Sequence, residues 1–168
     1  MEYKVRRIIM TLVVVGIVYL NFVFKVNGFL GNQGLEGFAD VKGTAIIILW
    51  NVLLMVILMI VGHILLHVIG AIGASVKNEI NPETRGQDID LEELFDDVDD
   101  EMDKLINLKS SQVGFIMVGL GFVLGLASIL MDYQFGVMLV VMYSSFMLGE
   151  VVEAAYKLVM YHRGVIHG

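Results

Sequence analysis

The chain contains no cysteine and only one proline among its 168 residues. The absence of cysteine excludes a disulfide framework, a thiolate metal site and a thiol nucleophile. Charged residues are also scarce at 17%, whereas hydrophobic residues make up 57% of the chain. This composition is too apolar for an ordinary soluble domain. We therefore expect the chain to lie in a lipid bilayer.

Motifs that mark common enzymes are missing as well. The sequence has no phosphate-binding P-loop, no serine elbow, no dinucleotide-binding glycine pattern and no H-E-x-x-H zinc motif. These absences favour a protein that is not an enzyme, and no cofactor is predicted.

Acidic residues outnumber basic ones, and the net charge is −7. More than half of the 18 acidic residues lie between Asp88 and Lys109. Such a segment repels a phosphate backbone, which argues against direct nucleic-acid binding. A basic protein partner fits this charge better.

The chain contains long apolar runs. Four of them are each long enough to cross about 30 Å of hydrocarbon, and they cover residues of about 8–26, 44–72, 113–131 and 135–160. The predicted fold class is all-α: a polytopic membrane protein whose four transmembrane helices form two hairpins, with an acidic amphipathic cytoplasmic helix between them. The predicted domains are a first hairpin (1–76), a cytoplasmic linker with the acidic helix (77–112) and a second hairpin (113–168).

Lysine and arginine distribution gives the expected orientation. In a four-span arrangement Lys25 and Lys42 fall on one side. The other side receives Lys4, Arg6, Arg7, Lys77, Arg85, Lys104, Lys109, Lys157 and Arg163. The positive-inside rule then places both termini and the acidic segment in the cytoplasm.

Glycine recurs at positions 28, 31, 34 and 37 of the first connection, between Gly28 and Gly43. We expect a turn-rich extramembrane loop, because glycine commonly serves backbone geometry. The alternative is a loop that dips back into the membrane and is anchored by Phe29, Leu30, Leu35 and Phe38.

The acidic segment has the pattern of a helix with one apolar face. Asp90 and Glu93 have capping-box spacing, and apolar residues follow at intervals of three and four. The predicted partner-binding residues are Leu91, Leu94, Phe95, Val98, Asp99 and Met102. A merely solvated acidic face and loose cation binding are the alternatives; an EF-hand is excluded because the required glycine and final glutamate are missing. With no helix breaker before Val113, the acidic helix could continue into the third span.

Small residues mark a packing face on the third span: Gly121, Gly125 and Ser128. In lipid such residues let two helix backbones approach closely. Packing within the chain is the first interpretation, and homo-oligomer formation is the second.

Ionisable residues within the second and fourth spans suggest a site. His63 and His67 share one helix face, as do Glu150 and Glu153. In the predicted topology all four reach a comparable depth. Two imidazoles and two carboxylates could hold a divalent metal ion or relay protons. The alternative is ordinary pairing: Glu153 with Lys157, and Glu150 with Arg6 or Arg7.

Two short motifs resemble those of a group of small prokaryotic four-helix membrane proteins without an agreed activity. They are Asp100-Glu101-Met102-Asp103-Lys104 before the third span and Tyr161-His162-Arg163-Gly164 at the end of the fourth. Met102 stands where that group usually has arginine. The resemblance implies the four-span topology and a prokaryotic inner membrane, and it adds no catalytic residue.

The expected function is that of a non-enzymatic, membrane-anchored regulatory or scaffolding protein, whose acidic cytoplasmic helix binds a basic or regulatory partner. The alternative is a small oligomeric transporter or channel for a cation or proton, built on His63, His67, Glu150 and Glu153.

Overall fold

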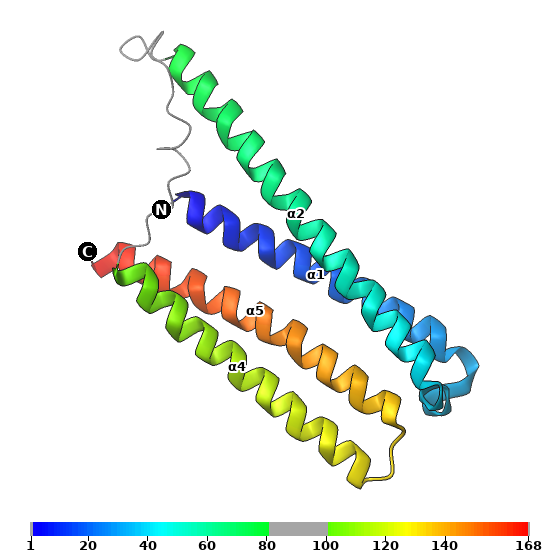
Figure 1. The fold of residues 1–168 in the computed structure, drawn as a ribbon. Helices are drawn as coiled ribbons and strands as arrows, with labels where there is room; N and C mark the ends of the chain where they lie inside the picture. Colours follow the sequence, from blue (N-terminus) through cyan, green and yellow to red (C-terminus); the bar gives the residue numbers. More distant parts are fainter. Residues whose placement is uncertain (1, 81–100, 168) are drawn as a thin grey trace.

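The computed structural model describes residues 2–80 and 101–167 as long helices (Figure 1). In chain order they are α1 (Glu2–Leu30), the 3-10 helix η1 (Gly31–Ala39), α2 (Val41–Ile80), α4 (Glu101–Leu130) and α5 (Phe135–His167). The sequence's one proline, Pro82, lies in none of these helices, so no ring interrupts their hydrogen-bond ladders. The predicted all-α fold class is confirmed.

Four helices are long and apolar enough to cross a membrane: Tyr3–Leu30, Val41–Gly73, Glu101–Leu130 and Phe135–His162. The shortest of these segments has 28 residues, whereas about 20 helical residues suffice for 30 Å of hydrocarbon. In a bilayer a helix satisfies its own backbone hydrogen bonds, which favours this structure for such sequences. The four helices support a multi-pass membrane protein.

Helix α5 is the centre of the arrangement and contacts α1, α2 and α4 (Figure 1). Helices α4 and α5 are joined by the short turn 131–134, in which Asp132 adopts a left-handed conformation with φ 61°. The start of α1, the start of α4 and the end of α5 lie at one end of the molecule, here called the terminal end. Helix α2 runs toward that end but diverges from α5 on the way.

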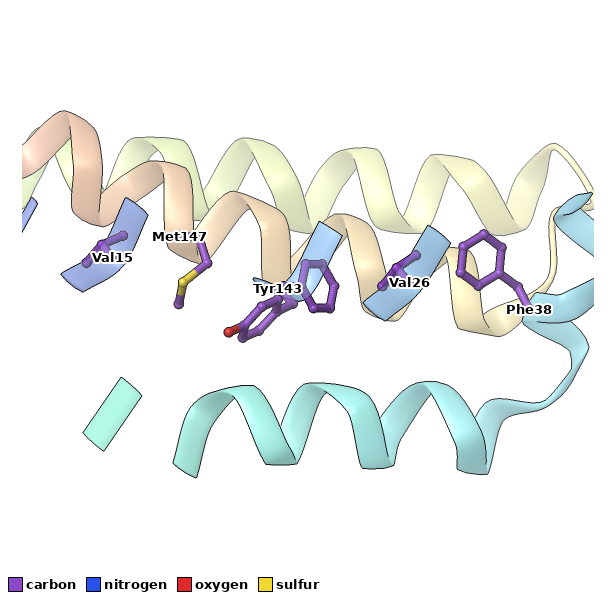
Figure 2. Close-up of a cluster of buried hydrophobic side chains, with 6 residues drawn as sticks. Val15, Val26, Phe38, Tyr143 and Met147 are labelled. Atoms are coloured by element: carbon purple, nitrogen blue, oxygen red, sulfur yellow. The ribbon is translucent and has the colours of Figure 1, made fainter. Parts of the chain in front are cut away.

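A buried apolar cluster joins α1, η1 and α5 and extends from the middle of α1 to η1 (Figure 2). It consists of Val15, Phe22, Val26, Phe38, Tyr143 and Met147. The rings of Phe22 and Tyr143 lie 4.4 Å apart at 57°, a tilted geometry that aromatic pairs favour.

Glycine permits the close packing of α4 on α5. A Cβ atom added to Gly121 would lie 1.9 Å from Ser145 Oγ, and one added to Gly149 would lie 3.0 Å from the Gly114 carbonyl oxygen. A Cβ on Gly125 would be 3.2 Å from Met138 Cγ. The approach at Gly121 is too close for a larger residue, and those at Gly149 and Gly125 are tight, so the small residues determine how near the two helices come.

The first connection is more regular than the expected loop. Gly28, Phe29 and Leu30 continue α1, and residues 31–39 form η1. Two residues of η1 have a positive φ, Gly31 at 42° and Gly34 at 59° with ψ −144°, and glycine tolerates this without a Cβ clash. Phe38 is buried in the cluster of Figure 2 rather than exposed.

Candidate functional site

Polar and charged side chains from three helices meet at the terminal end around Asp103. This residue lies in the first turn of α4, where a carboxylate interacts favourably with the helix dipole. Its side chain accepts hydrogen bonds from Lys4 Nζ of α1 at 2.5 Å and from Tyr161 Oη of α5 at 2.7 Å. Only 8% of Asp103 is exposed. We call these three residues the Asp103 junction.

An apolar layer lies directly beneath the junction. Ile106, one turn after Asp103, is completely buried and clusters with Ile8, Ala154 and Tyr161. The shielding strengthens the ion pair by lowering the local dielectric, and it makes the loss of either partner costly. The start of α4 is therefore fixed to both α1 and α5.

A second polar group follows along the α4–α5 contact. The Glu153 carboxylate accepts a hydrogen bond from Ser111 Oγ at 3.1 Å, and Lys157 Nζ lies 2.8 Å from the same carboxylate oxygen. Lys157 is one helical turn after Glu153, a spacing that places both on one face. The pairing expected for Glu153 is thus present.

Between these groups is a polar cavity of about 90 Å³. Its lining includes both carboxylates of α5 together with three cations, a half-buried amide and the phenol of the junction: Glu150, Glu153, Lys4, Arg7, Lys157, Asn107 and Tyr161. The volume is sufficient for several water molecules or a small ion. Chemically the cavity offers both donors and acceptors, and it selects no single ligand class.

The two histidines proposed for an ion site point to other partners. His63 Nδ1 lies 2.8 Å from the Met59 carbonyl oxygen of its own helix, and His67 Nε2 lies 3.2 Å from Tyr3 Oη of α1. Glu150 and Glu153 line the polar cavity. Across residues 2–80 and 101–167, no three His, Asp or Glu side chains are grouped so that they could hold one metal ion. The four residues therefore do not form one metal site in this structure.

The predicted partner-binding face falls largely outside the described residues. Leu91, Leu94, Phe95, Val98 and Asp99 all lie between residues 81 and 100. Met102 is described and is exposed, as are Leu105 and Leu108 on the following turns of α4. Helix α4 runs from Glu101 to Leu130 without interruption, so this last part of the acidic segment is continuous with the third span.

The predicted packing residues lie at the contact with α5. Gly121 and Gly125 face Ser145, Met138 and Met142 of that helix. Ser128 is buried, and its hydroxyl donates to the Gly125 carbonyl at 2.6 Å. These small residues therefore pack α4 against α5 of the same chain.

Sequence reasoning did not identify the Asp103 junction. Lys4 entered only the charge count for orientation, although the two motifs of the resemblance contain Asp103 and Tyr161. These residues are 58 positions apart and hydrogen-bond to each other. Their position in two otherwise separate motifs was the available signal.

Comparison of the chain with protein-family models, curated proteins and solved structures finds no match.

Proposed function

We propose that this chain is a non-enzymatic, multi-pass protein of a prokaryotic inner membrane that holds an acidic helix at the cytoplasmic face, where the helix binds a basic regulatory protein. The observation that carries the proposal is the Asp103 junction. It fixes the last turns of the acidic segment to α1 and α5 through a buried carboxylate. A fixed segment loses less conformational freedom when it binds.

The start of α4 is divided into two faces that suit this role. Ile106 is turned into the bundle, whereas Met102, Leu105 and Leu108 are exposed, as is Glu101. Apolar anchors surrounded by charge are typical of a surface that binds a helix or a groove of opposite charge.

The basic side chains of the terminal end support the proposed orientation in the membrane. Lys4 begins α1, Lys104 begins α4 and Lys157 lies near the end of α5, whereas Lys25 and Lys42 flank η1 at the other end. The positive-inside rule assigns the terminal end to the cytoplasm.

Site-specific photocrosslinking in native membranes tests this proposal. Leu108 and Phe115 are both exposed, and their seven-residue spacing puts them on nearly the same face of α4 at different depths. A photoreactive residue at position 108 should yield a protein adduct that weakens in high salt, because exposed charge attraction is screened. The matched residue at 115 should yield lipid adducts. Equal adducts at both positions, or none at 108, would contradict the proposal.

The polar cavity favours a second candidate, a small oligomeric transporter or channel for a cation or proton. Glu150 and Glu153 line this cavity together, and carboxylates at membrane depth commonly mark ion pathways. Cation or proton flux in proteoliposomes that falls in Glu150→Gln would support this function. An absence of flux with the unmodified chain would exclude it.

A further inference from the structure

A second and larger hollow lies between α2 and α5. Its volume is about 450 Å³, within the range of small-molecule pockets. The hollow exists because α5 packs closely on α4 while α2 diverges (Figure 1). Two of its lining residues, Val52 and Phe146, are about half exposed, so it opens toward the surrounding membrane. We call it the α2–α5 groove.

The groove is almost entirely apolar and contains one charged residue among those that line it, Glu150. Throughout the described part of the chain Glu150 makes no hydrogen bond or ion pair. The neighbouring carboxylate, Glu153, is already bound by Ser111 and Lys157. Glu150 also borders the polar cavity with Lys4 and Arg7, so it stands where the two hollows adjoin. An unpaired carboxylate at membrane depth favours the approach of a cation.

The remaining walls suit a bulky cation better than an acyl chain alone. Tyr143 and Phe146 provide aromatic rings, and Met55, Met142 and Met147 provide flexible, polarisable side chains. Aromatic faces attract cations through their quadrupole, and methionine adapts to ligands of varied shape. In Figure 2 the Tyr143 and Met147 side chains extend from α5 toward α2.

Tyr143 adds an unsatisfied polar atom. The residue is 6% exposed, and its hydroxyl has no hydrogen-bond partner among the described residues. A buried hydroxyl without a partner costs free energy that a bound polar group can recover. The charge, the aromatic rings and this hydroxyl all lie along one groove.

We infer that the α2–α5 groove binds a small hydrophobic organic cation that enters from the membrane, with its charge near Glu150 and its apolar groups against α2 and α5. This binding activity is independent of the acidic helix and its partner.

The test is equilibrium binding of radiolabelled tetraphenylphosphonium to the full chain in lipid nanodiscs. Tetraphenylborate has nearly the same shape and the opposite charge, so it serves as the matched probe. We expect saturable tetraphenylphosphonium binding at one site and no saturable binding of tetraphenylborate. Glu150→Gln should weaken tetraphenylphosphonium binding about tenfold or more, because it removes the negative charge that attracts the bound cation.

Two further variants separate charge from shape. Glu36→Gln neutralises an exposed carboxylate in η1 that does not line the groove, and should leave binding unchanged. Val52→Trp fills the groove from α2 and should abolish binding with Glu150 intact. The inference is overturned by an absence of saturable binding, by equal binding of both probes, which would indicate a lipid-filled groove, or by unchanged binding in Glu150→Gln. Glu150 is exposed, so its amide variant should fold normally.

Discussion

The α4–α5 pair and helix α2 are both strongly apolar, yet they are packed very differently. Gly114, Gly121 and Gly149 bring α4 and α5 into backbone contact. In the most apolar window of α2 only 6% of the residues are buried, compared with 28% in α5. Lipid is as apolar as leucine, so apolar side chains alone do not bring helices together. Small residues and polar contacts decide which helices pack.

Helix α2 packs against α1 and α5, but few of its residues are buried. Asn51 is fully buried, but its amide donates to the Ile47 carbonyl of its own helix at 2.9 Å. Lys25 lies 5.4 Å from the Trp50 ring, and His67 meets Tyr3 at 3.2 Å. Few buried contacts indicate low local stability. We therefore expect α2 to move more readily than the α4–α5 pair.

The largest loss of unfolding free energy is expected from a substitution where α1 is joined to the α4–α5 pair. Lys4→Met removes the cation that contacts the Asp103 carboxylate at 2.5 Å, and removing one partner of a buried ion pair costs about 3–5 kcal/mol. The free energy of unfolding, measured in bicelles, should fall by that amount. The double variant Lys4→Met with Asp103→Leu should recover most of it. The matched variant Lys104→Met removes an exposed charge and should change little; an equal loss in both single variants would contradict the assigned role.

Breaking the α4–α5 contact itself should have the next largest effect. Gly121→Leu forces a side chain into Ser145, and such overpacking costs about 1–3 kcal/mol. Gly119 has no atom within 4 Å of an added Cβ, so Gly119→Leu should be nearly neutral in the same unfolding assay. Similar losses in the two variants would show that glycine content, rather than contact with α5, determines stability.

A corresponding glycine substitution on α2 should lower the unfolding free energy less than Gly121→Leu does. A Cβ on Gly62 would meet Met10 Sδ at 2.6 Å, but the end of a methionine side chain can move aside. Gly62→Leu should therefore lower the unfolding free energy by about 1 kcal/mol or less. Gly73→Leu, with open space around it, is the control. If Gly62→Leu were as harmful as Gly121→Leu, α2 would be packed as tightly as α4.

The smallest effect is expected at Trp50. Replacing this ring with leucine removes its interaction with Lys25, which is worth about 0.5–1 kcal/mol at an exposed site. Trp50→Phe should retain part of that stabilisation. Thermal unfolding of the two variants in the same bicelles checks the difference, and a greater loss in Trp50→Phe than in Trp50→Leu would exclude the interaction.

Helical content and packing residues could be predicted because their signals are local. Apolar runs longer than a bilayer needs gave the four helices, and the spacing of Gly121 and Gly125 gave the face that lies on α5. The short connection at Asp132 to Gln134 likewise required α4 and α5 to be neighbours.

The polar contacts could not be derived in the same way. Equal depth along two helices does not determine the rotation of each helix or the distance between them, so the depths of His63 and Glu150 alone could not predict whether their side chains meet. His63 bonds the Met59 carbonyl of its own helix. The contact between Asp103 and Tyr161 depends on how α5 lies against α4, and no local pattern specifies that.

Distances between spin labels in lipid nanodiscs test the difference between the two regions most directly. One pair joins Leu108 of α4 to Val159 of α5, and the other joins Ile72 of α2 to the same Val159; all three residues are exposed. A fixed α4–α5 pair and a weakly held α2 predict a narrow distance distribution for the first pair and a clearly broader one for the second. Equally narrow distributions, or a broader one between Leu108 and Val159, would contradict the account.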